Sequence, residues 1–261
     1  MATRRTSLVT GSDQGIGLAI ARRLAKQGSN LVLTGFGVPA DEAAICKQVE
    51  ADFGVDVIFH AADLSKTDQI GGLVAAALDR FGGVDILVNN AAAPRRPVSV
   101  AQMDIEEWDL AVAINLNAPF HLVQAFLPLM LERRWGRIVN IASVFGLVGT
   151  ANRAGYVTTK HGMVGFTHAV AAETMHSGVT CNAVCPGLTM TPRQEREIAL
   201  IARTEDVSLA DAEQILARRL VAEKFLSADS MAAAVGYFCS EEAGDTTGVA
   251  LPVDGGQSAV R

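Results

Sequence analysis

The sequence predicts an α/β protein in which helices cover both faces of a doubly wound, seven-stranded parallel sheet. Short apolar runs alternate with longer helical patterns along all 261 residues. Several of these runs, such as ILVNN and RIVNIA, are continuously apolar, which is typical of parallel strands that are buried on both faces. Because no Pro- or Ser-rich linker divides the chain, we expect a single domain over residues 1–261.

Each element follows from this alternation. Seven apolar runs are expected to form strands, at residues 7–10, 30–34, 55–60, 86–89, 137–142, 179–184 and 249–253. Helical patterns between them include residues 17–27, 68–80, 108–134, 156–176 and 230–239. A polar, helix-prone insertion at about residues 188–227 precedes the last strand. Ligands of such sheets bind beyond the carboxyl ends of the strands, so we expect this insertion to be a lid.

The composition excludes several classes of function. The 22 Lys and Arg against 28 Asp and Glu give a net charge of −6, which argues against general affinity for nucleic acid or an anionic membrane. No signal peptide precedes the first strand, and no run of 18 apolar residues suggests a membrane span, so we expect a soluble cytoplasmic protein. The four cysteines and five histidines lack metal-ligand spacing, and we expect no metal site.

The segment TGSDQGIG, residues 10–17, joins the first expected strand to the first expected helix. Glycines allow a tight turn there and let the backbone approach a pyrophosphate, whose charge the helix N-terminus favours. The spacing is G-x-x-x-G-x-G rather than G-x-G-x-x-G, and a purely structural turn is the alternative. The segment indicates a dinucleotide site.

Small or polar residues also end three later strands, in NNAA at 89–92, NIAS at 140–143 and CPG at 185–187. The carboxyl ends of parallel strands share one sheet edge, so these residues are expected where a cofactor would lie. Ser and Asn favour turns in any protein, which is the alternative for each segment taken alone.

Tyr156 is one of only two tyrosines, and Lys160 follows it four positions later. Residues four apart in a helix share one face, so the ammonium can act on the phenol. A neighbouring cation favours the phenolate and lowers the pKa of the phenol, as a proton carrier at neutral pH requires. The alternative is an ordinary pair on an amphipathic helix.

Together these features resemble the short-chain dehydrogenase/reductase family over nearly the whole chain. The resemblance implies a single Rossmann-type domain, usually in a homotetramer, and an enzyme that acts on the CH-OH group of a small-molecule alcohol or on the matching ketone. Eight elements match in the family's order: TGxxxGIG at 10–17, Asp63 with Leu64, NNA at 89–91, Asn115, Ser143, Tyr156 with Lys160, Pro186 with Gly187, and VDGG at 253–256.

The resemblance implies four catalytic residues. Tyr156 would be the general acid/base, and Lys160 would lower its pKa and hold the nicotinamide ribose. Ser143 would hydrogen-bond the substrate oxygen as charge develops on it. Asn115 matches the position that extends a proton relay from the lysine through a water on its backbone.

The resemblance also implies a nicotinamide cofactor. NAD sites usually carry an acid after the second strand and NADP sites a base, but LTGFG at 33–37 has neither. Asp13 would repel a 2′-phosphate, so we expect NAD. The usual NNAG is NNAA here, and Ala92 is expected to shift the cofactor slightly. The expected cofactor-binding residues are Gly11, Asp13, Gln14, Gly15, Ile16, Gly17, Phe36, Asp63, Leu64, Asn90, Tyr156, Lys160, Pro186, Gly187, Thr189 and Thr191.

Within the family, several segments resemble bacterial D-3-hydroxybutyrate dehydrogenases, but the carboxylate clamp of that group is largely replaced. Pro94, Phe145 and Glu197 stand where those enzymes have a glutamine, a histidine and a lid glutamine, and Arg153 keeps a cation. An aromatic face and an acid favour a bulkier aryl or amino alcohol over a small hydroxy acid. The expected substrate-contacting residues are Pro94, Ser143, Phe145, Arg153, Tyr156, Leu188 and Glu197.

Two other functions stay open at this point. One is a D-3-hydroxybutyrate dehydrogenase in which Arg153 holds the carboxylate of a rebuilt site. The other is a non-catalytic dinucleotide-binding protein, against which the intact set of four catalytic-type residues argues.

Overall fold

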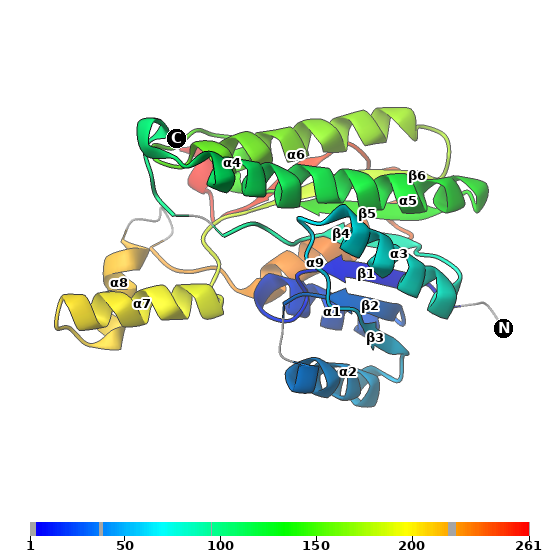
Figure 1. Ribbon diagram of the computed structural model, residues 1–261, viewed down its shortest axis with the longest axis horizontal. Helices are drawn as coiled ribbons and strands as arrows, with labels where there is room; N and C mark the ends of the chain where they lie inside the picture. The colour runs from blue at the N-terminus through cyan, green and yellow to red at the C-terminus, as the bar shows by residue number, and fades with distance from the viewer. Residues whose placement is uncertain (1–3, 37–38, 95, 219–222, 261) are drawn as a thin grey trace.

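The computed structural model describes residues 4–36, 39–94, 96–218 and 223–260. All seven strands pair in parallel in one sheet, in the order β3-β2-β1-β4-β5-β6-β7 (Figure 1). This confirms the predicted doubly wound sheet, while the single-domain organisation stays a prediction. The strands are β1 Thr6–Thr10, β2 Asn30–Thr34, β3 Val57–Phe59, β4 Ile86–Asn89, β5 Gly136–Ile141, β6 Val179–Pro186 and β7 Ala250–Val253.

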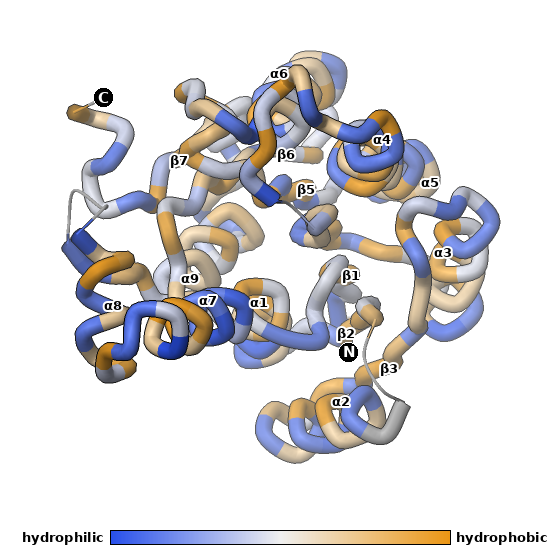
Figure 2. Tube along the Cα trace, turned by 60° about the vertical axis from the view of Figure 1, so that its left-hand side comes forward, coloured by the Kyte–Doolittle hydropathy of each residue, from blue (hydrophilic) through white to orange (hydrophobic). Residues whose placement is uncertain are grey.

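Helices cover both faces of this sheet (Figures 1 and 2). Neighbouring strand residues point to opposite faces, so Val9 packs in the core beneath α1 and α9 while Leu8 packs beneath α3, α5 and α6. The α-helices are α1 Gly15–Lys26, α2 Pro39–Phe53, α3 Thr67–Phe81, α4 Ile105–Val112, α5 Ala118–Glu132, α6 Ala154–Glu173, α7 Pro192–Thr204, α8 Leu209–Ala217 and α9 Ala228–Phe238.

The strand order reverses beside β1, which lies between β2 and β4. From β1 the chain adds β2 and β3 on one side of the sheet. It then crosses over and adds β4 to β7 on the other side of β1. At such a point the connecting segments diverge and leave a crevice beyond the carboxyl ends of the strands. The residues after β1, β4, β5 and β6 therefore converge on one region, as the sequence predicts.

One expected helix, residues 108–134, differs from the structure. It is divided into α4, a π-helical turn at Ala113–Asn117, and α5. Pro119 explains the division, because a proline has no N–H to donate to the carbonyl of the residue four positions earlier and its ring crowds that carbonyl. That residue is Asn115. The wider π turn thus occurs at a position that was expected to be catalytic.

Most of the expected lid, residues 188–227, forms α7 and α8, and residues 219–222 lie outside the described part. The two ends of the segment are tied together by a bridge between Thr189 and Leu226, with Met190 N–H donating to the Leu226 carbonyl at 2.8 Å. Ile198 and Leu216 pack together in a small core of the segment's own. Figure 1 shows α7 and α8 standing out from the sheet, where they can cover the site from one side.

The helical run Ile105–Glu132 is long and apolar enough to cross a membrane by length and composition alone, which qualifies the expectation of no spanning segment. In its most apolar window, 44% of the residues are buried inside the protein. Leu122, Phe126 and Met130 belong to the core under the sheet. Because the core helix of a soluble protein meets the same criterion, one such run is weak support for a membrane span.

Candidate active site

A cavity of about 380 Å³ lies beyond the carboxyl ends of β4, β5 and β6, between them and α7. It brings together Ser143, Tyr156 and Lys160 with many of the residues expected to bind cofactor or substrate. The predicted residues that line it are Ile16, Asn90, Ser143, Phe145, Arg153, Tyr156, Lys160, Pro186, Gly187, Leu188, Thr189, Thr191 and Glu197.

The glycine-rich turn forms one end of this region and needs its glycines. A Cβ on Gly17 would lie 2.0 Å from the carbonyl oxygen of Gly11, so only glycine fits there. Gly11 and Gly15 have φ values of +60° and +57°, in the left-handed region. The Asn90 amide donates to the carbonyls of Thr10 and Gly11, at 2.8 and 2.9 Å. Asn90 therefore holds the turn in place.

The N-terminus of α1 fits an anion. Gln14, at the N-cap, makes no side-chain capping hydrogen bond, and no acidic residue occupies the first turn. The backbone N–H groups of that turn thus remain available and carry the positive end of the helix dipole. With Gly11 and Gly15 permitting close approach, this cradle suits the pyrophosphate of a dinucleotide.

Asp13 lies against the end of β2. A Cβ on Gly35 would be only 2.7 Å from the Asp13 carboxylate oxygen, so the two residues are in contact. The neighbouring Ser12 fastens this arrangement, because its N–H donates to the Thr34 carbonyl at 2.9 Å and its Oγ accepts from the Thr34 N–H at 3.1 Å. Phe36 is 72% exposed. Gly37, the last residue of LTGFG, lies outside the described residues.

Asp63 belongs to a turn after β3 and does not line the large cavity. Its Oδ1 accepts from the Ser65 N–H at 2.9 Å and from the Ser65 hydroxyl at 2.7 Å. These hydrogen bonds hold the pKa of the Asp63 carboxyl below its ordinary value. The adjacent Leu64 is buried in the core with α3.

Tyr156 and Lys160 project from the first turns of α6. Lys160 is only 2% exposed, and its Nζ donates to the carbonyl of Ile141 at 2.6 Å. The same nitrogen lies 5.8 Å from the centre of the Tyr156 ring. Ser143 stands at the end of β5, where its Oγ accepts from the Phe145 N–H at 3.2 Å. A phenol, a buried ammonium and a hydroxyl thus meet at one cavity.

Asn115, in the π turn, contacts α6 through Thr159 and does not line the large cavity. Its side chain is 1% exposed, and its Oδ1 accepts from the Ala93 N–H at 2.9 Å. Its Nδ2 donates to the Thr159 hydroxyl at 2.9 Å. The π turn, the loop after β4 and α6 are therefore joined through one amide group.

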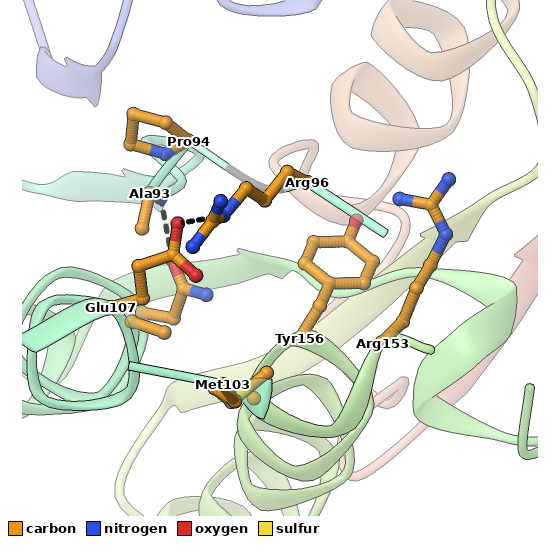
Figure 3. A pocket seen from close by; sticks show the side chains of 10 residues that line it. Ala93, Pro94, Arg96, Met103, Glu107, Arg153 and Tyr156 are labelled. Atoms are coloured by element: carbon orange, nitrogen blue, oxygen red, sulfur yellow. Dashed lines mark hydrogen bonds and ion pairs between the residues drawn. The ribbon is translucent and has the colours of Figure 1, made fainter. Parts of the chain in front are cut away.

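A second, much smaller cavity of about 30 Å³ lies on the Asn115 side of Tyr156. Figure 3 shows it, with Arg96 paired to Glu107 above it and with the side chains of Tyr156 and Arg153 pointing the same way. Both of these last residues line the large cavity as well. Pro94, expected in the substrate pocket, lines this smaller cavity and not the large one.

The lining of the large cavity combines apolar and charged groups. Phe145 and Leu188 face it together with the half-buried side chains of Arg153 and Glu197. Sequence reasoning missed several lining residues. Two of these, Arg193 and Gln194, could be found from the sequence, because they lie four and three residues before Glu197 on α7. The missed residues are Ile141, Ala142, Val144, Thr150, Arg193, Gln194 and Leu216.

Buried thiols take no part in this chemistry. Burial raises the pKa of Cys185 to about 11 and that of Cys239 to about 12, and it raises the pKa of Cys181 still further. All three are thiols rather than thiolates at neutral pH, and the thiolate is the nucleophile. All three belong to the hydrophobic core.

Comparisons with known proteins agree with this geometry. Residues 5–199 match the family model for short chain dehydrogenases. The chain is 39% identical over 256 residues to a D-beta-hydroxybutyrate dehydrogenase of Rhizobium meliloti, covering 98% of this chain and 99% of the relative. It is 41% identical to one from Cupriavidus necator, covering 98% of each. An actinorhodin polyketide ketoreductase solved with NADPH superposes with a TM-score of 0.89 at 36% identity over 99% of each chain. The predicted family resemblance is confirmed.

Proposed function

The chain belongs to the short-chain dehydrogenase family, and we propose that it is an NAD-dependent oxidoreductase that interconverts a bulky aryl or amino secondary alcohol and its ketone. The observation that carries this proposal is the meeting of Ser143, Tyr156 and Lys160 at one cavity. A homotetramer in the cytoplasm, with no nucleic-acid or membrane partner, is part of the same proposal.

Tyr156 moves the proton in this scheme. A nicotinamide cofactor, which the glycine-rich turn and Lys160 would hold, would supply the hydride transfer to or from the substrate carbon. Tyr156 accepts the hydroxyl proton during oxidation and returns it to the oxygen during reduction. The Lys160 ammonium, held by the Ile141 carbonyl, favours the phenolate form and lowers the pKa of the phenol.

Ser143 and Asn115 support this step. The Ser143 oxygen already accepts from the Phe145 N–H, so its own hydrogen can be donated to the substrate oxygen as negative charge develops there. Pro119 has no N–H for the Asn115 carbonyl, which can therefore hold a water that passes protons onward from Lys160. The tyrosine thus has both a hydrogen-bonded substrate and a route for its proton.

The choice of NAD rests on Asp13. Its carboxylate lies against Gly35 at the end of β2, which is the side of the site where the adenosine ribose is expected. A carboxylate there can accept a hydrogen bond from a ribose 2′-hydroxyl and repels a 2′-phosphate. Asp13 thereby replaces the acid that NAD sites usually carry after the second strand, although the similar ketoreductase was solved with NADPH.

The choice of substrate rests on Phe145 and Glu197. Phe145 offers an apolar face next to Ser143, and the half-buried Glu197 carboxylate on the same cavity suits an ammonium group. A small hydroxy acid is the second candidate, because Arg153 and Arg193 line the same cavity and the hydroxybutyrate dehydrogenases are about 40% identical. The Glu197 carboxylate distinguishes the two candidates, because it attracts an ammonium group and repels a carboxylate.

Tyr156→Phe removes only the phenolic proton carrier. We expect kcat to fall about 100-fold or more, the scale of a positioned acid/base, while NADH still binds. Tyr237→Phe is the matched control, because it removes the other tyrosine, whose exposed hydroxyl bonds Thr246. Steady-state kinetics and NADH fluorescence titrations measure both effects. Near-normal turnover by Tyr156→Phe would rule out the assignment.

The Asp13 argument predicts that kcat/KM with NAD exceeds that with NADP about tenfold or more, a difference of about 1.4 kcal/mol. In Asp13→Asn the carboxylate charge is lost while the shape is kept, so we expect the ratio to move toward NADP. Steady-state kinetics with each cofactor give the answer. Equal efficiency of the two cofactors in the native chain would contradict this reading.

The Glu197 argument predicts that an aryl amino alcohol has a higher kcat/KM than 3-hydroxybutyrate. Glu197→Gln should lower kcat/KM for the amino alcohol about tenfold and leave the amine-free analogue within about twofold, since only the charge is removed. Glu195→Gln, on an exposed position of the same helix, is the control. A clear preference for 3-hydroxybutyrate would contradict this argument and would indicate that Arg153 and Arg193 bind the carboxylate of the substrate.

A further inference from the structure

We propose that Thr159 is a positioning residue for the reaction, which fixes the side chain of Asn115 and thereby holds the π turn and the loop after β4 against Tyr156. The inference rests on the proposed function, since it assigns Thr159 a part in the step that Tyr156 performs. Thr159 lies on α6, directly before Lys160 and one turn after the start of the helix.

The hydrogen bonds around Thr159 leave Asn115 a single arrangement. The Ala93 N–H can only donate, so the Asn115 atom that faces it must be the oxygen. The Asn115 NH₂ group then faces the Thr159 hydroxyl, which must accept. The hydroxyl hydrogen of Thr159 is left for the carbonyl of Gly155 at 2.8 Å, or that of Tyr156 at 3.1 Å.

Thr159, Asn115 and Ala93 are all buried, so water cannot replace a hydrogen bond that one of them loses. Thr159 is 0% exposed, Asn115 1% and Ala93 4%. Without the Thr159 oxygen, the Asn115 amide would lose a buried hydrogen-bond acceptor. The amide could regain a partner only by rotating, which would break its bond to Ala93. One hydroxyl therefore controls both contacts of Asn115.

The network acts at the position of the reacting phenol. Asn115, Ala93 and Tyr156 all line the small cavity of Figure 3, and Tyr156 forms its boundary with the large cavity. Thr159 links the helix that carries Tyr156 to the two segments opposite it. A shift of these segments moves the phenol relative to Ser143, and small misplacements of reacting groups reduce rate strongly.

The same helix contains a matched pair that lacks this connection. Eight residues later, Thr167 is also 0% exposed, and its hydroxyl donates to the carbonyl four residues back, that of Met163, at 2.8 Å. It also accepts from the Nδ2 of a buried asparagine, Asn140, at 2.9 Å. Thr167 thus repeats the chemistry of Thr159, but its partner Asn140 lines neither cavity, whereas Asn115 lines the small one.

The experiment compares Thr159→Val with Thr167→Val. Valine keeps the shape and removes the hydroxyl, so both variants should show similar losses of thermal stability. We expect kcat to fall about tenfold or more only in Thr159→Val, with KM for NAD changed less than about threefold. Thr159→Ser restores the oxygen and should recover most of kcat. An Asn115→Leu variant and its double variant with Thr159→Val should show that the two effects on kcat are not additive.

Several results would overturn the inference. Unchanged kcat in Thr159→Val, an equal fall in Thr167→Val, or additive effects with Asn115→Leu would each show that Thr159 is merely structural. If Thr159→Val does not fold, Thr159→Cys supplies a similar size and a weaker acceptor, and its kcat must lie below that of Thr159→Ser. Failure here is distinct from failure of the proposed function, which would appear as full activity in Tyr156→Phe.

Discussion

A buried ammonium group determines the architecture of this site. Lys160 is among the largest fully buried side chains, and a buried charge is costly unless fixed groups satisfy it. The Ile141 carbonyl at the end of β5 accepts one of its hydrogen bonds at 2.6 Å. That contact requires α6 to approach the end of β5 closely, and Gly146 permits it, since a Cβ there would lie 2.7 Å from the Lys160 carbonyl oxygen. The approach places Tyr156 and Ser143 at the same cavity.

Tyr156 separates two cavities of different size. Tyr156 lies between a large cavity that can hold a cofactor and an organic substrate and a small one bounded by Asn115 and the loop after β4. A phenol that moves a proton needs substrate on one side and a fixed polar environment on the other. In the proposed function the large cavity holds the substrate, and the network of Asn115 and Thr159 provides the polar environment. The N-terminus of α1 lies at the same sheet edge, and its Ile16 lines the large cavity.

The fold and much of the site could be predicted because they depend on local patterns. Continuous apolar runs and glycine spacing predicted the parallel sheet and the turn at Gly11, and residue order indicated the family. The π turn could not be predicted from periodicity, although Pro119 was the signal for it. Pro94 lines the small cavity and not the large one, and this could not be predicted because the direction of a loop depends on contacts distant in sequence. Arg193 and Gln194 lie four and three residues before Glu197, so their place at the cavity could have been predicted from that spacing. Leu216 on α8 could not be predicted, because its position depends on how the lid packs.

The central claim is that the Lys160 ammonium lowers the pKa of the Tyr156 phenol, and absorbance titration tests it directly. The chain has only two tyrosines, so a Tyr237→Phe background leaves Tyr156 as the single phenol to titrate. The account predicts a midpoint below the ordinary value of about 10, and a rise of about one pH unit or more when Lys160→Met removes the charge. A midpoint at the ordinary value that does not move in Lys160→Met would contradict the account.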